Sequence, residues 1–413
     1  MHSAQEVISY LFSLTNRGIK LGLDRIRTAA ARAGDPHNAF ASIHIGGTNG
    51  KGSTCAFVES CLRNAGYRTG MFTSPHLVDF SERFCISGKP VSQQVWLASF
   101  RELHPIIEEL RLTFFEASTL IAFDIFRRTA VDWAVIEVGL GGRLDSTNIL
   151  MPRLTALTSI DYDHEHILGR SLQQIAREKL GIIKQGVPLV SYLPADSAVW
   201  SQIAEHCRHL GAPLTFAGEV ISGSPCGFTY RDNVYQTHLP GTHQHRNAAL
   251  ALEIVNSLDL EPPPDPAGGI LSAMLPGRFQ RIEVDGQEYV FDVGHNPAAT
   301  EMLVANIKSH FPGRSICIIA GIMKDKRKDR MAPHYAAIAS TIIFTRAQIQ
   351  RAELPENLRK LIPADFAGDI LTAEKTGRAV ELGQQSGADI ICVTGSFYVV
   401  GEVMALLGAK PFG

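Results

Sequence analysis

The sequence predicts an α/β protein with a larger first domain, built on a mostly parallel sheet, and a smaller second α/β domain. Three observations lead to this prediction: the length of 413 residues, the alternation of short apolar runs with helix-like runs, and a glycine-rich turn between the first such pair. A chain of this length is too long for one ordinary core, so two domains are expected. Strands that alternate with helices are typical of a parallel sheet covered by helices.

The predicted strands are short apolar runs. They are residues 40–45, 68–73, 133–138, 154–160 and 187–193 in the first domain, and 289–293, 315–320, 341–345 and 389–394 in the second. Apolar residues at helical spacing predict helices between them, as at 57–65 and 299–309. The turn Pro276-Gly277 places the boundary near residue 280, so the predicted domains are residues 1–280 and 281–413.

The composition is that of an ordinary globular protein. Hydrophobic residues make up 45% and charged residues 19%, and the formal net charge is −2. This balance gives no strong attraction to nucleic acid or to an anionic membrane. The chain starts without a basic segment followed by an apolar one, and it has no run of about 18 apolar residues. We therefore expect a cytoplasmic protein with neither a nucleic-acid nor a membrane partner. Seven scattered cysteines without a CxxC pair indicate neither a disulfide framework nor a zinc site.

The glycine-rich turn at residues 46–53 predicts a site for a nucleotide phosphate chain. It reads Gly-Gly-Thr-Asn-Gly-Lys-Gly-Ser and lies between the first predicted strand and the first helix of the alternation. Glycines let successive backbone N–H groups converge on phosphate oxygens, the helix start adds its positive dipole end, and Lys51 adds a point charge. The loop departs from a strict Walker A motif, because Gly52 separates Lys51 from the hydroxyl of Ser53.

Acids and histidines follow two later strands of the first domain. Glu137 ends an apolar strand, where a buried carboxylate is costly unless it is paired or metal-bound. The alternative is an acid that caps a neighbouring turn. The segment 161–166 places ionisable groups at a strand's carboxyl end, where open α/β sheets bind ligands. His164 is a candidate metal ligand there, and the alternative is a hydrogen-bonded loop residue.

Other polar segments have weaker local signals. The local pattern predicts Lys179 to be a solvated helical lysine. It predicts the mixed-sign run 324–330 to be a solvated loop, and contact with glutamate or a polyglutamate tail is the alternative. Segments 243–252 and 292–297 have the polar character of ligand-facing loops. Helix capping is the alternative, with Asn296 as N-cap and Pro297 at the first helical position.

Taken in order, these motifs resemble the folylpolyglutamate synthase/dihydrofolate synthase family, within the Mur-type amide ligases. The resemblance runs nearly end to end, and the glycine after Lys51 is how this family writes its loop. It implies a P-loop ATPase-like first domain, a Rossmann-like second domain and a monomer. The landmarks are residues 47–53, 73–77, 82–83, 113–116, 137–148, 163–164, 178–182, 275–279 and 292–297.

The resemblance implies an ATP-dependent, ADP-forming ligase that adds L-glutamate to dihydropteroate and to reduced folates through an acyl phosphate. The implied cofactors are ATP and one or two Mg²⁺ ions. The implied nucleotide-binding residues are Gly47, Thr48, Asn49, Gly50, Lys51, Gly52, Ser53, Asn247, Arg278, Asp292 and His295. The implied metal ligands are Ser74, Glu137, His164 and Lys179, the last after carbamylation by CO₂. Lys51, Lys179 and His164 are the implied catalytic residues.

The resemblance also implies a pterin-binding pocket that is lined by three segments and an arginine. A flat heteroaromatic ring can stack on Phe115, and Asp145 can accept its amino donors. For Phe115, ordinary core packing is the alternative. The implied substrate-binding residues are Ile19, Lys20, Leu21, Arg83, Thr113, Phe114, Phe115, Glu116, Leu144, Asp145 and Ser146.

Three other functions stay open at this point. The first is a Mur-type ligase acting on a cell-wall nucleotide precursor, which Phe115 and the run 141–145 disfavour. The second is a P-loop kinase or GTPase, which needs no glutamate. The third is a non-catalytic nucleotide-binding regulator. The run 139–145 resembles bacterial bifunctional members, so we expect both synthase activities.

Overall fold

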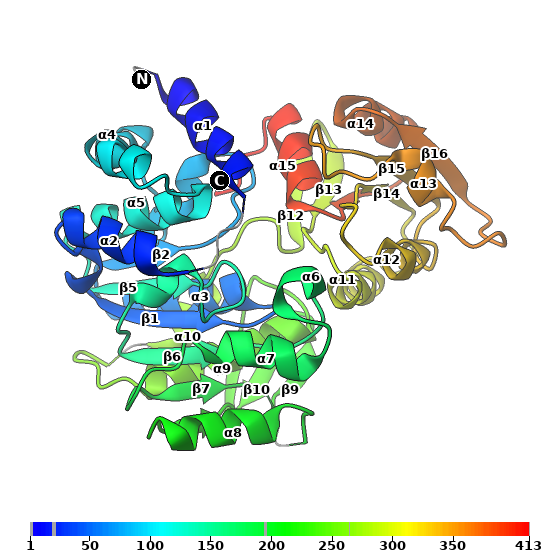
Figure 1. Ribbon diagram of the computed structural model, residues 1–413. Coiled ribbons are helices and arrows are strands. Elements are labelled where there is room, and N and C mark those ends of the chain that lie inside the picture. Colours follow the sequence, from blue (N-terminus) through cyan, green and yellow to red (C-terminus); the bar gives the residue numbers. More distant parts are fainter. Residues whose placement is uncertain (1–2, 19–21, 194–195, 264, 413) are drawn as a thin grey trace.

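An eight-stranded sheet forms the centre of the larger of two α/β domains (Figure 1). The structure is a computed structural model and describes residues 3–18, 22–193, 196–263 and 265–412. The strand order of the large sheet is β4-β3-β2-β5-β1-β6-β7-β8. The strands are β1 (Ala41–Gly46), β2 (Thr69–Phe72), β3 (Phe84–Ile86), β4 (Lys89–Pro90), β5 (Trp133–Glu137), β6 (Leu154–Leu157), β7 (Leu189–Ser191) and β8 (Leu214–Phe216).

Six neighbouring strands of this sheet run parallel, namely β2, β5, β1, β6, β7 and β8. At the edge beside β2, β3 pairs antiparallel with β2, and β4 pairs antiparallel with β3. In the centre, Ile45 pairs with Glu137 on one side and with Ala156 on the other. The carboxyl ends of β1, β5 and β6 therefore meet at one edge. The loops that follow these strands are neighbours, although they are far apart in the sequence.

Helices cover both faces of the large sheet. The side chains of β5 alternate between the two faces, as the pleat requires: Val135 packs with α3, α9 and α10, whereas Ala134 and Ile136 pack with α1, α2, α4 and α5. A third core lies under α7 and α8. The helices are α1 (Ala4–Ser13), α2 (Asp24–Arg32), α3 (Lys51–Asn64), α4 (Gln93–Glu109), α5 (Phe114–Arg128), α6 (Glu165–Leu168), α7 (Leu172–Leu180), α8 (Trp200–His209), α9 (Thr242–Asn256) and α10 (Pro266–Ser272), with the 3₁₀ turns η1 (Leu14–Arg17), η2 (Pro36–Asn38), η3 (Phe80–Arg83) and η4 (Ser146–Ile149).

A small antiparallel sheet, in the order β11-β10-β9, adjoins α9. Its strands are β9 (Ile221–Ser224), β10 (Gly227–Tyr230) and β11 (Asn233–Gln236). Phe228 and Tyr230 belong to the core around α3 and α9, and the Tyr230 hydroxyl donates to Glu253 Oε2 at 2.7 Å. The sequence patterns did not predict this sheet.

The second domain is a six-stranded sheet in the order β12-β13-β17-β14-β15-β16, in which only the β12–β13 pair is antiparallel. An apolar core lies on each face. Its strands are β12 (Gln280–Val284), β13 (Gln287–Phe291), β14 (Ile316–Ala320), β15 (Thr341–Thr345), β16 (Asp369–Ala373) and β17 (Ile390–Thr394). Its helices are α11 (Pro297–His310), α12 (Lys328–Tyr335), α13 (Pro355–Arg359), α14 (Thr376–Gln385) and α15 (Phe397–Leu406).

The predicted two-domain α/β architecture is confirmed, and a strand lies at each predicted position. One difference matters for the site. The predicted strand 154–160 ends as β6 at Leu157, because the next residues leave the sheet and bond to the glycine-rich loop. None of the helices in the described part of the chain is long and apolar enough to cross a membrane.

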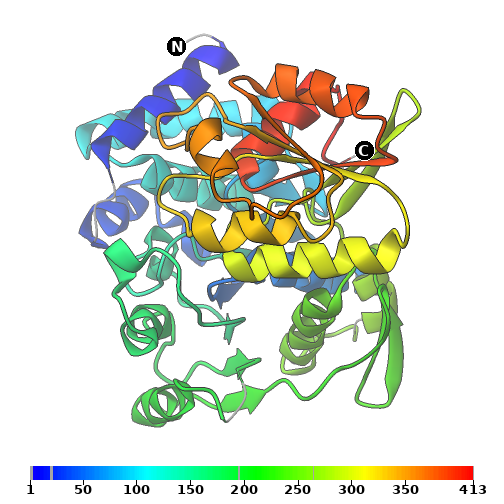
Figure 2. The same cartoon turned by 90° about the vertical axis from the view of Figure 1, so that its right-hand side faces the viewer.

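The second domain packs against the first through α15, which lies on the side facing the larger domain (Figures 1 and 2). A Cβ atom on Gly401 of this helix would overlap the carbonyl oxygen of Leu77, so the two backbones are in close contact. The Leu77 side chain, from the first domain, packs against a core of the second. The two domains therefore share an interface beside the carboxyl edge of the large sheet.

Candidate active site

A cavity of about 240 Å³ lies between the two domains, at the carboxyl edge of the large sheet. Its wall combines loops that follow β1, β2, β5 and β6 with residues of the second domain. It brings together most of the residues predicted for nucleotide and metal, namely Gly47, Thr48, Asn49, Gly50, Lys51, Gly52, Ser74, Glu137, His164, Lys179, Arg278 and His295. Ser53, Asn247 and Asp292 are the predicted members that do not form part of the wall.

The glycine-rich loop has the conformation expected of a phosphate loop. Gly47 has φ of 143° and Gly50 has φ of 85°, values that residues with a side chain rarely adopt. A Cβ atom on Gly47 would overlap Thr158 Oγ1. Helix α3 begins at Lys51, so the free N–H groups of its first turn point toward the cavity end of the loop. Lys51 Nζ donates to Gly47 O at 3.2 Å and to Thr48 O at 3.1 Å.

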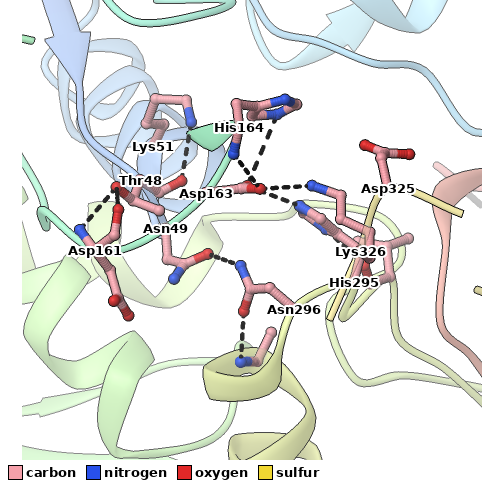
Figure 3. A network of polar contacts seen from close by, with 12 residues as sticks. Thr48, Asn49, Lys51, Asp161, Asp163, His164, His295, Asn296, Asp325 and Lys326 are labelled. Carbon is pink, nitrogen blue, oxygen red and sulfur yellow. Dashed lines mark hydrogen bonds and ion pairs between the residues drawn. The ribbon is translucent and has the colours of Figure 1, made fainter. Parts of the chain in front are cut away.

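The segment after β6 holds this loop in place. Ser159 accepts the Thr48 N–H on its carbonyl oxygen at 2.7 Å and the Asn49 N–H on its hydroxyl at 2.9 Å. Thr158 Oγ1 donates to Asn49 O at 2.6 Å, and the Thr48 hydroxyl bonds with the backbone of Asp161 (Figure 3). These bonds fix the loop before any ligand binds, which lowers the cost of ordering it.

Glu137 occupies the position predicted from the sequence, at the end of β5 and on the cavity wall. Its side chain is buried, and Oε2 accepts the Ser74 N–H at 2.8 Å. Burial raises the pKa of the Glu137 carboxyl, and the nearby Lys51 and the Ser74 N–H oppose that rise. The Glu137 carboxylate and the hydroxyl of Ser74, which is also on the cavity wall, are oxygen ligands of the kind that Mg²⁺ prefers.

His164 lies at the start of α6, with φ of 50° in the left-handed region. Its backbone N–H donates to Asp163 Oδ1 at 2.9 Å. Asp163 Oδ2 lies 3.8 Å from His164 Nε2 and 3.9 Å from His295 Nε2 (Figure 3). Burial lowers the pKa of His164 to about 4 although Asp163 opposes it, so the ring is neutral near pH 7 and has a lone pair for a metal ion.

Asp163 lies close to ionisable side chains from both domains. Burial would raise the pKa of the Asp163 carboxyl, yet His164, Lys326 and His295 lower it to about 2. Lys326, from the second domain, lies 2.7 Å from Asp163 Oδ1. The carboxylate is therefore ionised at neutral pH and pairs with a cation from the other domain.

The local prediction that Lys179 is a solvated lysine is wrong. Its side chain is buried on the cavity wall, and Nζ donates to Gly47 O at 2.7 Å. Burial, with a contribution from Lys51, lowers the pKa of Lys179 to about 7. The helical pattern could not reveal this, because the burial comes from a loop 132 residues away in the chain.

The predicted metal ligands fit a site that the protein completes only in part. Among the described residues, no three His, Cys, Asp or Glu side chains gather into a ready metal site. Glu137 and His164 are the two such side chains of the predicted set. Mg²⁺ usually keeps several waters and binds through one or two carboxylates together with substrate phosphates. A small set of protein ligands next to a phosphate loop is consistent with this way of coordinating Mg²⁺.

The segment just before the domain boundary contributes a cation to the cavity, and the second domain contributes a capped helix. Arg278 lies over the Phe397 ring, 5.1 Å from its centroid. Asp292 accepts the N–H groups of Phe279 at 3.0 Å and Gly294 at 2.8 Å. Asn296 is the N-cap of α11, as predicted, and its Nδ2 also donates to Asn49 Oδ1 of the phosphate loop at 2.7 Å (Figure 3). In the first domain, Asn247 of α9 adjoins Gly50.

None of the predicted pterin-side residues that the structure describes forms part of the cavity wall. Ile19, Lys20 and Leu21 fall outside the described residues. Phe115 contacts Gly139, which is on the wall, and packs with Phe72 at a ring distance of 6.0 Å. Phe114 stacks on Phe12 at 5.5 Å, and the buried Arg83 guanidinium lies 5.0 Å from the Phe114 ring.

Several of these residues also have structural partners. Thr113 and Glu116 form the capping box of α5, and Glu116 pairs with Arg25 at 3.0 Å. Asp145 caps η4 through the Thr147 N–H and accepts the Leu140 N–H at 2.8 Å. Both oxygens of Asp145 therefore already have local donors. The partly buried Leu144 and the buried Ser146 flank Asp145. The roles of all these residues in binding a pterin stay predictions.

Sequence reasoning missed two cations on the second domain's side of the cavity, Lys326 and Arg351. Lys326 was predicted to belong to a solvated loop, but its side chain is only 8% exposed. The run of alternating charges around it gave no sign that one lysine points inward. Arg351 lies in an irregular segment, and its guanidinium pairs with Asp325 at 3.2 Å. No sequence signal could have found it.

The comparisons with known proteins agree with this arrangement. A family model described as the glutamate ligase domain of Mur ligases matches residues 277–397. The fold, the phosphate loop and this match define an amide ligase of the Mur type.

Full-length relatives narrow the class further. The chain is 33% identical over 422 residues to the dihydrofolate synthase/folylpolyglutamate synthase of Bacillus subtilis, covering 97% of this chain and 98% of the relative. It also matches E. coli FolC in complex with DHPP and ADP, with a TM-score of 0.87, 30% identity and coverage of 98% and 97%. A third match is a bifunctional folylpolyglutamate synthase/dihydrofolate synthase with Mn, AMPPNP and L-glutamate bound, with a TM-score of 0.86, 29% identity and 98% coverage of both chains. The chain belongs to the dihydrofolate synthase/folylpolyglutamate synthase family.

Proposed function

We propose that this protein is an ATP-dependent, ADP-forming ligase that joins L-glutamate to dihydropteroate and to reduced folates. One observation carries the proposal: the phosphate loop and Glu137 share a cavity with a second domain of the glutamate ligase type. The similar structures that hold DHPP with ADP, and AMPPNP with L-glutamate, support the same set of substrates. ATP, a divalent cation, a pterin-bearing acid and an amino acid are its ligands.

In the proposed reaction, a carboxylate oxygen of the pterin-bearing acid attacks the γ-phosphorus of ATP, and ADP leaves. The amine of L-glutamate then attacks the carbonyl carbon of the acyl phosphate, loses a proton, and expels phosphate as the amide forms. The protein needs no nucleophile of its own. Its task is to align the carboxylate with the γ-phosphate and to offset the negative charge of the transferring oxygens.

The residues for this task line the cavity. Lys51 lies on the cavity wall at the start of α3, so we assign its amine and the free N–H groups of that helix start to stabilising the charge of the β- and γ-phosphates. Glu137, Ser74 and His164 would hold Mg²⁺, which supplies further charge neutralisation at the transferring oxygens. Asn247, Arg278, Asp292 and His295 are assigned to the rest of the nucleotide.

We also propose that Lys179 carries a carbamate. Its amine is buried on the cavity wall and has a backbone carbonyl, not a carboxylate, as its hydrogen-bond partner. A carbamate would turn this cation into an anion that can hold a second Mg²⁺ near the loop. A buried ammonium ion is costly unless it is well paired, and among the described residues the hydrogen-bond partner of Lys179 Nζ is the Gly47 carbonyl.

The remaining assignments extend the proposal. Phe115, held against Gly139, is assigned to one side of the pterin ring, with Arg83 and Asp145 near its polar groups. We place the domain boundary at residue 280, where β12 begins. We further propose that the protein acts as a monomer in the cytoplasm.

A phosphate-release assay with purified protein, Mg²⁺, ATP, dihydropteroate and L-glutamate tests the function. We expect release that stops when any one substrate is omitted, and a second activity when a reduced folate replaces dihydropteroate. ADP formation without phosphate release or glutamate would indicate a kinase instead, and phosphate release without glutamate would indicate a nucleotide hydrolase such as a GTPase. Release only with a cell-wall nucleotide precursor would indicate another Mur-type ligase, and ATP binding without any release would indicate a regulator.

A further inference from the structure

Among the described residues, two side-chain hydrogen bonds join the domains directly beside the phosphate loop (Figure 3). Lys326 Nζ of the second domain lies 2.7 Å from Asp163 Oδ1 of the first. Asn296 Nδ2 of the second domain donates to Asn49 Oδ1 of the loop at 2.7 Å. We call these four residues the interdomain clasp. Each contact ends on a segment that also holds a predicted site residue, since Asn49 is in the loop and Asp163 precedes His164.

The ion pair of the clasp is shielded from water, unlike most ion pairs of this protein. The side chains of Lys326 and Asp163 are 8% and 14% exposed. Exposed pairs contribute little, whereas removing one partner of a shielded pair leaves a costly uncompensated charge. Lys328 offers a direct comparison. It lies two residues away and also has a partner at 2.7 Å, but that partner is Glu353, within the second domain.

The Asp163 carboxylate transmits this contact to the site. The same Oδ1 atom that pairs with Lys326 accepts the backbone N–H of His164 at 2.9 Å, and His164 is held in the left-handed region. Asp163, His164 and Lys326 also form the wall between the central cavity and a second, more open hollow on the outer side. The position of Lys326 therefore affects both the orientation of His164 and the enclosure of the cavity.

We propose that Lys326 is a positioning residue, which through Asp163 holds the second domain and His164 in the arrangement needed for phosphoryl transfer. The Asn49–Asn296 bond fixes the same arrangement at the phosphate loop. This inference rests on the proposed function for its kinetic test only. Its structural test uses the protein without ligands.

The kinetic test compares Lys326→Met with Lys328→Met and Lys326→Arg. Lys326→Met should lower kcat at least tenfold, because the aliphatic chain remains but Asp163 loses its ion pair with the second domain's lysine. Lys328→Met should stay within twofold of the unaltered protein, and Lys326→Arg should recover most of the loss. Adding Asp163→Asn to Lys326→Met should cost no more than the larger single loss, because both changes break one pair. A Lys326→Met variant within twofold of the unaltered protein would overturn the proposal.

The structural test is hydrogen exchange measured by mass spectrometry on the ligand-free protein. Lys326→Met should accelerate exchange at least threefold in segments 46–53, 159–168 and 294–297, with the remaining peptides unchanged, whereas Lys328→Met should leave all of them unchanged. Equal exchange in both variants, or acceleration spread over the whole chain, would reject a positioning role. Should Lys326→Met not fold, Lys326→Gln carries the same test. If the unaltered protein has no ligase activity, the proposed function fails, and exchange alone still decides whether the clasp exists.

Discussion

Two lysines face the phosphate site, and their surroundings give them different roles. Lys51 Nζ is held by two loop carbonyls, at 3.2 and 3.1 Å, from which it can turn to a phosphate at little cost. Lys179 is buried and bonds to Gly47 O at 2.7 Å. Lys51 is therefore suited to pair with a ligand phosphate as a cation. The buried and fixed amine of Lys179 is suited to the proposed carbamylation.

The first prediction concerns Lys51. Lys51→Ala should reduce ADP release at least about a thousandfold, because it removes the cation that the phosphate loop itself carries at the start of α3. The fold should persist, since the side chain bonds only to its own loop. Glutamate-dependent ADP release and circular dichroism measure the two effects. Substantial turnover by this variant would contradict the assignment.

The second prediction concerns the carbamate. Lys179→Ala should lose activity, and added short carboxylic acids such as acetate should restore part of it, because they can enter the space left by the side chain and supply the missing anion. The same acids should not restore Lys51→Ala, which serves as the control. Full activity of Lys179→Ala without additives would rule out a role for the carbamate.

The candidate site could be predicted from sequence where its signal is local. Glu137 ends a strand and Asn296 precedes a proline, and each lies where its neighbours in the chain indicate. Lys179 and Lys326 could not be placed in this way. Their burial comes from Gly47 and Asp163, which lie 132 and 163 residues away. A charged residue in a helical or loop pattern looks the same whether or not a distant segment covers it.

At the scale of elements, the contact between α15 and the loop at residues 74–77 joins the two domains. Gly401 allows the helix backbone to approach Leu77 O, and the Leu77 side chain enters a core of the second domain. This apolar contact complements the polar clasp on the other side of the cavity. A change at either place should alter how the domains meet.

The third prediction follows from this packing. Gly401→Ala should destabilise the protein by about 1–3 kcal/mol, because the new methyl group forces the helix away from the loop. Gly377→Ala, in α14, is the matched control: a Cβ atom there has no neighbour closer than 3.9 Å. Urea unfolding measures both variants. Equal stability of the two would show that the close approach is unimportant.

Elements were predicted well where strands are central and apolar, as for β1, β5, β14 and β15. The elements that were missed are short, exposed or antiparallel. Strand β4 has two residues, and every residue of β9 is exposed, so neither carries the apolar run that marks a buried strand. Their pairing is decided by neighbours in space, which a local pattern does not contain.

At the scale of the whole molecule, neither domain forms the site alone. The first domain supplies the phosphate loop, Glu137 and Lys179, and the second supplies His295 and Lys326 across the cavity. Enclosure between two domains helps to exclude water during transfer. The central claim is that, within this enclosure, the γ-phosphate of ATP is transferred to a substrate carboxylate.

An isotope-transfer experiment tests this claim most directly. Dihydropteroate labelled with ¹⁸O in its carboxylate is incubated with the protein, Mg²⁺, ATP and L-glutamate, and the released phosphate is analysed by mass spectrometry. The proposed chemistry predicts one ¹⁸O atom in each phosphate released, because the carboxylate oxygen that attacked the γ-phosphorus leaves with it. Amide formation that releases phosphate without ¹⁸O would contradict the acyl-phosphate mechanism.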